Sequence, residues 1–286
     1  MASQSKAQLL TDAFDALKSR YKITARANRF AVLEAVIYGI CHEGMTREQA
    51  NQALSRFKDE FFDWNEVRVS ALRDIQTVFA GFPDPETRAQ LVRRFLRQLF
   101  KRTYGFTLEA VQKKPLKDAV KDLQEYEALK SDYVSATVIQ LSLNGHALPL
   151  DAAARRGLER LGVTDEKTAP EALRSTVERA VPKNRGIEFV DLLEDLTHDT
   201  CVDGEPECGR CVLRTMCAYA LAKGKPAKAE AATPKPSKPR LPLPVKAASA
   251  KQAAPPEPDP ASPPAPKGSK PPAAAPKSGK THPPKS

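Results

Sequence analysis

The sequence predicts an all-α body of about 220 residues followed by a disordered tail. Apolar residues recur at helical spacing through the body, and the alternation typical of strands is absent. Residues 223–286 contain no aromatic residue and hold 18 of the 25 prolines. Such a segment cannot bury enough apolar surface to offset its ordering entropy, whereas the body is long enough for one or two hydrophobic cores.

The first half of the body contains most of the expected helices. The run 30–39 is mostly apolar, which suits a buried helix. Thr46 precedes a run with Ala50 and Phe57 on one face, and Pro85 stands where a first helical turn tolerates proline. We expect helices over 6–21, 30–39, from Thr46 onward, and over 67–79, 85–100, 108–111, 116–129 and 134–143.

The second half begins with a turn signal at Asn144-Gly145. Asp151 directly precedes a helical run, and its carboxylate can accept the free amide protons of the first turn. We therefore expect Asp151 to cap a helix over 152–161. Further helices are expected over 171–181 and 187–196.

The positive charge is concentrated in the tail. The chain has 45 basic and 35 acidic residues, a net charge of +10. Residues 223–286 hold 12 lysines and 1 arginine against 3 acidic residues, so the body is neutral. A basic, extended segment suits nonspecific binding to a polyanion such as DNA, because phosphate neutralisation releases counterions. A solubilising linker without a partner is the alternative interpretation.

The N-terminus is polar and lacks the apolar stretch of a signal peptide. No segment approaches the roughly 20 apolar residues that span a bilayer. We expect a soluble cytoplasmic protein with no membrane partner, associated with the nucleoid in a bacterium or located in the nucleus of a eukaryote.

Four of the five cysteines lie close together, with the spacing Cys201-x6-Cys208-x2-Cys211-x5-Cys217. Four thiolates in one short loop can surround an iron–sulfur cluster, with one cysteine on each iron. Structural zinc is the competing interpretation, although zinc more often uses two Cys-x2-Cys pairs separated by a longer loop. A reducing compartment favours metal over disulfides.

This spacing resembles the iron–sulfur loop of endonuclease III and its relatives in the helix-hairpin-helix DNA glycosylase superfamily. The neighbouring residues agree, including Val181-Pro182, His198-Asp199-Thr200 and Pro206-Glu207. The resemblance covers roughly residues 25–220 and is strongest over 148–217. It implies a [4Fe–4S] cluster held by Cys201, Cys208, Cys211 and Cys217.

The resemblance also implies two helical domains and divides the chain into four parts. Residues 1–26 form an N-terminal helix that joins the cluster domain, and 27–143 form a six-helix barrel with a degenerate helix-hairpin-helix. Residues 144–222 form the iron–sulfur cluster domain, and 223–286 are the disordered basic tail rich in Lys, Pro and Ala. A flipped base would enter the cleft between the domains, with Asp151 at its mouth.

Asp151 is the expected catalytic residue. Removal of a base needs stabilisation of an oxocarbenium-like sugar, which a nearby carboxylate supplies. In the family this carboxylate belongs to an aspartate at a helix start, followed five residues later by an arginine. Asp151 and Arg156 stand at that spacing. A helix cap with no catalytic role would also explain the aspartate.

The family's lyase chemistry is not expected. Bifunctional members use a lysine as the attacking amine, just before a Thr-Ala pair. Aligning Ser135-Ala136 with that pair places Val134 at the lysine position, and Lys130 lies one helical turn too early. Members without the lysine exist, so base removal without strand cleavage remains the expectation.

Several residues are expected to contact DNA. Lys130 and Ser131 replace glycines whose backbone amides approach a phosphate in the family hairpin, so their side chains would make that contact. The other expected phosphate contacts are Arg156, Arg210 and Arg214, for which ordinary solvated surface is the alternative. Cys41 or His42 takes the place of the family's wedge into the base stack, for which simple packing is the alternative.

The resemblance thus implies a DNA-binding base-excision-repair protein, acting as a monomer on damaged or mismatched double-stranded DNA. Our first hypothesis is a monofunctional DNA N-glycosylase in which Asp151 stabilises the sugar cation and water is the nucleophile. The second is a catalytically inactive [4Fe–4S] protein of the same fold that binds DNA or senses damage. A third makes the tail the active part, with the body docking to repair or chromatin partners.

Overall fold

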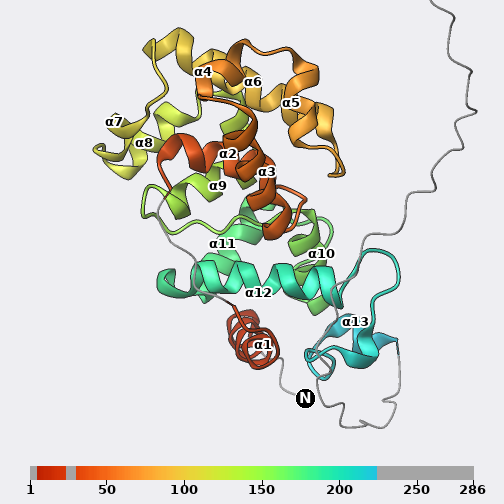
Figure 1. The fold of residues 1–286 in the computed structure, drawn as a ribbon. Helices are drawn as coiled ribbons and strands as arrows, with labels where there is room; N and C mark the ends of the chain where they lie inside the picture. Colours follow the sequence, from red (N-terminus) through yellow and green to blue (C-terminus); the bar gives the residue numbers. More distant parts are fainter. Residues whose placement is uncertain (1–4, 24–29, 224–286) are drawn as a thin grey trace, which may run out of the picture. The chain divides into compact units, whose positions relative to one another are not determined.

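The computed structural model describes residues 5–23 and 30–223. Within these ranges the secondary structure is helical and contains no strand, which confirms the all-α prediction (Figure 1). The described residues belong to a compact unit that spans Met1–Glu230. Apart from Lys223, the predicted basic tail lies outside the described residues. None of the described helices combines the length and apolarity that a bilayer-spanning segment needs.

The helices follow one another with short connections. In chain order they are α1 (Lys6–Arg20), α2 (Val32–His42), α3 (Arg47–Glu60), α4 (Trp64–Val69), α5 (Leu72–Val78), α6 (Pro85–Thr103), α7 (Glu109–Gln112), α8 (Leu116–Leu123), the 3-10 helix η1 (Glu127–Lys130), α9 (Asp132–Leu141), α10 (Ala152–Leu161), α11 (Pro170–Ala180), the 3-10 helix η2 (Lys183–Arg185), α12 (Gly186–Asp199), the 3-10 helix η3 (Cys208–Arg210) and α13 (Ala218–Ala222).

Local sequence signals account for several helix starts. Thr46 caps α3 in a capping box, in which the Thr46 hydroxyl and the Gln49 side chain each accept the other residue's backbone N–H. Asp151 caps α10, and its Oδ1 accepts the Ala154 amide at 2.8 Å. Both N-terminal ends predicted from the sequence are confirmed. Pro85 occupies the first turn of α6, as expected.

Two predicted helices are wrong in their extent. The helix expected over 67–79 is interrupted between α4 and α5, because Ser70 and Ala71 adopt extended backbone with ψ of 155° and 149°. The helix expected over 116–129 ends at Leu123. The chain then turns so that Tyr126 and Leu129 are buried, at 5% and 2% exposure. Tertiary packing outweighs helix continuity in this segment.

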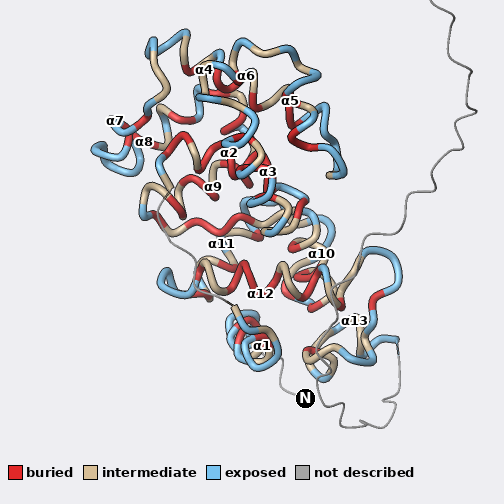
Figure 2. Tube along the Cα trace, in the orientation of Figure 1, coloured by how far each residue is buried: buried red, intermediate tan, exposed pale blue. Residues whose placement is uncertain are grey.

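Two hydrophobic cores fill the described body. The first is built from helices α2 to α9, and the second joins α1 to α10, α11 and α12 (Figure 2). Phe14 of α1 stacks on Phe189 of α12, with ring centroids 6.2 Å apart. The N-terminal helix is therefore part of the same core as the segment that precedes the cysteines. The domain boundaries given above stay a prediction.

Candidate functional site

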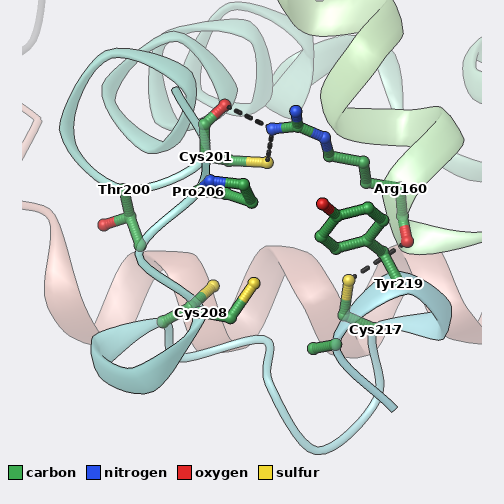
Figure 3. Close-up of a pocket in the computed structure, with 9 residues that line it drawn as sticks. Arg160, Thr200, Cys201, Pro206, Cys208, Cys217 and Tyr219 are labelled. Carbon is green, nitrogen blue, oxygen red and sulfur yellow. Dashed lines mark hydrogen bonds between the residues drawn. The ribbon is translucent and has the colours of Figure 1, made fainter. Parts of the chain in front are cut away.

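The four clustered cysteines line one hollow. The loop after α12 carries Cys201, and η3 and the following turn bring Cys208, Cys211 and Cys217 to the same hollow (Figure 3). Within the described residues, no group of three or more His, Cys, Asp or Glu side chains is placed so that it could hold a metal ion. The four thiols line the wall of the hollow. Four soft sulfur donors in one loop are the ligand set that an iron–sulfur cluster takes.

The thiols of this hollow are set in apolar surroundings. Burial raises the pKa of Cys211 to about 11 and also raises the pKa of Cys217, and the neighbouring thiols add to both increases. Backbone N–H groups of Tyr219 and Ala220 point at Cys217 and act in the opposite direction. Amide hydrogen bonds to cysteine sulfur are a feature of iron–sulfur sites, where they tune the cluster. Each iron of such a cluster takes one cysteine, so the four thiols around the hollow fit it although they do not converge on a single metal ion.

Arg160 of α10 holds the cysteine loop to the second core. Its guanidinium donates to the carbonyl oxygens of Val202 at 2.7 Å and Gly204 at 3.0 Å. It also lies 3.6 Å from Cys201 Sγ and 5.2 Å from the Tyr219 ring centroid (Figure 3). No local sequence pattern indicates this contact, because Arg160 and the loop are separated by more than forty positions.

The three arginines expected at DNA have partners within the protein. Arg156 donates to the Cys201 carbonyl at 3.3 Å, and its Nε is buried without a hydrogen-bond acceptor. Arg210 is exposed and bonds to Asp199 and Glu207. Arg214 is half-buried and takes part in further interactions. Arg156 thus reaches the cysteine loop from α10, whereas Arg210 is itself part of that loop, and contact of these arginines with DNA stays a prediction.

A second hollow lies where the two cores meet, beside Asp151. Its enclosed space is about the size of one water molecule. It is lined by residues of α2, α9, α10, α12 and the neighbouring loops, namely His42, Met45, Tyr133, Pro149, Asp151, Ala154, Val190, Glu194 and Thr197. Asp151 is half-buried, and one carboxylate oxygen is engaged by the α10 amide. The capping and the hollow are compatible with a carboxylate that also faces a substrate.

Three polar side chains in this hollow form a continuous hydrogen-bonded chain. The Tyr133 hydroxyl lies 2.9 Å from His42 Nδ1, and His42 Nε2 lies 2.9 Å from Glu194 Oε2. Tyr133 and His42 are 6% and 4% exposed. Sequence analysis did not connect these residues, since they come from α9, α2 and α12.

Val134 and Lys130 do not line the hollow beside Asp151. Val134 is 2% exposed and packs on α2, where a Cβ added to Gly39 would lie 3.2 Å from Val134 Cγ1. Lys130 is exposed at the end of η1. The α9 side chain that faces the hollow is Tyr133, one position before Val134. No amine among the described residues lines this space.

Ser131 caps α9 and binds Glu43 across the hairpin. Its hydroxyl accepts the Val134 amide and lies 3.1 and 3.0 Å from the two Glu43 carboxylate oxygens. Burial raises the pKa of Glu43, and the charges of Asp151 and Asp132 add to the increase. Glu43 thus brings a second carboxylate near Asp151, which sequence analysis did not identify.

The two residues expected at the base stack are buried. Cys41 is fully buried, and burial raises the pKa of its thiol to about 12. His42 uses both ring nitrogens for the contacts to Tyr133 and Glu194. Their role at the base stack stays a prediction.

No protein-family model matches this sequence, and no curated protein matches it. The solved structures that resemble the fold include the following three. A trapped endonuclease III–DNA covalent intermediate (an estranged-adenine complex) is 13% identical, with a TM-score of 0.60 over 77% of this chain and 99% of that one. A non-covalent endonuclease III–DNA complex is 13% identical, with a TM-score of 0.61 over 77% and 99%. A thermostable thymine-DNA glycosylase is 15% identical, with a TM-score of 0.55 over 76% and 97%. The chain therefore has an endonuclease III-like fold.

Proposed function

We propose that this protein is a monofunctional DNA N-glycosylase that removes a damaged or mismatched base from double-stranded DNA. The observation that carries the proposal is the position of Asp151, at the start of α10 and on the wall of a hollow between the two cores. The likeness in fold to endonuclease III and to a thymine-DNA glycosylase supports it. Function is argued from the site, because a fold alone hosts many activities.

Asp151 provides the electrostatic part of the reaction. As the bond between base and sugar breaks, positive charge develops on the sugar, and a nearby carboxylate stabilises it. Asp151 keeps one oxygen on the Ala154 amide, which fixes the orientation of the other. Water is the nucleophile, since the described residues place no amine in the hollow. The product is an abasic site in an uncut strand.

We propose further that Cys201, Cys208, Cys211 and Cys217 hold a [4Fe–4S] cluster. The shared hollow and the amide groups directed at Cys217 support this assignment. When bound, the cluster supplies positive charge that keeps four neighbouring thiols deprotonated, and it cross-links the loop. Arg160 and Arg156 attach this loop to α10, the helix that Asp151 caps. The cluster's role is thus to stabilise the catalytic helix and its surroundings.

A second candidate function is DNA binding without catalysis. It is favoured by the small size of the hollow beside Asp151, which has room for about one water molecule and not for a base. In that case the protein would recognise damaged DNA and leave the base in place.

Base release separates the two candidates. The full-length protein, purified anaerobically, is incubated with duplexes that carry uracil, oxidised pyrimidines, mismatched adenine or alkylated purines, each with and without subsequent alkali. Strand breaks that need alkali are expected for one substrate class, and they identify a monofunctional glycosylase. Breaks without alkali contradict the absence of lyase chemistry. Binding to abasic DNA without any break supports the non-catalytic candidate.

A further inference from the structure

The hollow beside Asp151 contains a hydrogen-bonded chain that the proposed chemistry leaves unused. Tyr133, His42 and Glu194 are joined by two contacts of 2.9 Å each. All three side chains line the same hollow as Asp151. The pairing within this tyrosine–histidine–carboxylate chain offsets the cost of burying its polar groups. The chain also lines a water-sized space beside Asp151, where it can act on a water molecule.

The direction of these hydrogen bonds follows from Glu194. Its Oε1 accepts the Arg47 backbone N–H at 2.8 Å, and its Oε2 contacts His42. Burial raises the pKa of Glu194, but the contacts with His42 and Arg47 outweigh burial and lower it overall, so the carboxylate is ionised. An ionised carboxylate only accepts, so His42 Nε2 carries the proton and Nδ1 accepts one from the Tyr133 hydroxyl.

In this arrangement a hydroxyl is hydrogen-bonded to a base, and a carboxylate orients the base. We infer that Tyr133, His42 and Glu194 form a proton relay that activates the attacking water, an inference that rests on the glycosylase function proposed above. Tyr133 touches the water and is the catalytic residue. His42 receives the proton through Tyr133, and Glu194 is a positioning residue for His42. The water-sized opening lies beside these groups.

With this relay, every proton and electron pair of the reaction is accounted for, and no further reagent is needed. The bond between base and sugar breaks, and its electron pair leaves with the base. The water oxygen forms the new bond to the sugar carbon, while one water proton passes to the Tyr133 oxygen and the tyrosine proton passes to His42 Nδ1. Glu194 balances the charge of the imidazolium. The proton then returns through Tyr133 to the departed base, which restores the relay.

The hydrogen bonds among Tyr133, His42 and Glu194 also connect the two cores, so a purely structural role has to be distinguished from a catalytic one. Tyr133→Phe removes the hydroxyl and keeps the ring, which packs edge-on to His42 at a centroid distance of 5.8 Å. We expect the single-turnover rate of base release to fall about 100-fold, a typical general-base contribution. The wild-type rate should depend on pH through the relay, and Tyr133→Phe should lose this dependence.

Tyr126→Phe is the matched control, because Tyr126 is a tyrosine of the first core with 5% exposure that lies outside the hollow. Its rate and pH profile should equal those of the wild type. Glu194→Gln keeps the size of the side chain but removes its charge, so its pH–rate profile should shift while the fold persists, as judged by circular dichroism.

The outcomes separate the relay from the function on which it rests. If Asp151→Asn abolishes base release while Tyr133→Phe leaves the rate and pH profile unchanged, the glycosylase stands and the relay is overturned. If Tyr133→Phe lowers only the melting temperature, the hydrogen bonds of Tyr133, His42 and Glu194 have a structural role, and the relay is likewise overturned. No release by the wild type from any duplex overturns both.

Discussion

His42 of α2 and Glu194 of α12 share a hydrogen bond of 2.9 Å between Nε2 and Oε2. Their side chains are only 4% and 12% exposed. The bond joins a helix of the first core to a helix of the second, across the hollow that Asp151 lines. Arg47 strengthens this junction through its ion pair with Asp195. The geometry of the candidate site thus depends on polar contacts between the cores, in addition to the apolar packing within each.

Asp151→Asn should lower base release at least about 100-fold while leaving the fold intact. The substitution removes the charge that stabilises the sugar cation. Asparagine caps helices as well as aspartate does, so α10 should keep its N-terminus and the melting temperature should change little. Single-turnover kinetics and thermal melts measure the two effects separately.

Asp63→Asn is the control for this substitution. Asp63 caps α4 in the same way, and its Oδ1 accepts the Glu66 amide at 2.7 Å, but it does not line the hollow beside Asp151. It should release base at the wild-type rate. Equal rates for Asp151→Asn and the wild type would remove Asp151 from the mechanism.

Cys208→Ser should abolish the brown colour of the anaerobically purified protein, since a [4Fe–4S] cluster needs one thiolate on each iron. Visible absorbance and iron content per chain are the measurements. Hydrogen exchange over 200–220 should increase, because the loop loses its cross-link. Cys41→Ala serves as the control, since Cys41 is buried away from the loop, and it should stay brown. A Cys208→Ser protein with unchanged iron content would contradict the ligand assignment.

Arg160→Met should destabilise the cysteine loop by about 2 kcal/mol. The guanidinium donates to three backbone carbonyls of the loop, and charge-assisted hydrogen bonds contribute about 1.5–3 kcal/mol each when buried, less when partly exposed as here. Urea unfolding and hydrogen exchange at 201–204 report the loss. Arg179→Met is the control, because Arg179 is exposed on α11 and bonds only within its own helix. Equal unfolding midpoints for the two variants would show that the Arg160 contacts contribute nothing.

Asp195 should make folding stability depend on pH. Burial raises the pKa of Asp195 to about 6; Arg47 opposes the increase, while Glu194, Asp191 and Glu48 add to it. A carboxyl whose pKa is higher in the folded than in the unfolded state favours folding below about pH 4, and this contribution is lost as pH rises through 6. The stability of the wild type relative to Asp195→Asn should therefore fall by roughly 1–3 kcal/mol between pH 4.5 and 7.5.

Urea unfolding across this pH range measures the difference. Asp59→Asn, on the exposed face of α3, should run parallel to the wild type at every pH. Parallel curves for Asp195→Asn and the wild type would show that the Asp195 proton is bound equally in both states.

Much of the fold could be predicted from short-range sequence patterns. The caps at Thr46 and Asp151 and the apolar periodicity of α2 and α6 each depend on residues within a few positions of one another. The break at Ser70 was missed because its extended backbone carries no proline or glycine signal. The end of α8 was missed because burial of Tyr126 and Leu129, and not their helix propensity, decides the path of the chain.

The helical class, the cap at Asp151 and the cysteine spacing follow from the sequence alone, because each of these features is local along the chain. The meeting of Tyr133, His42 and Glu194 beside Asp151 follows from tertiary packing. Tyr133 is 91 positions from His42, and Glu194 is 152 positions from it. Contacts over such separations depend on how three helices pack, and packing is set by the shapes of two whole cores. No periodicity or spacing in the sequence encodes them directly.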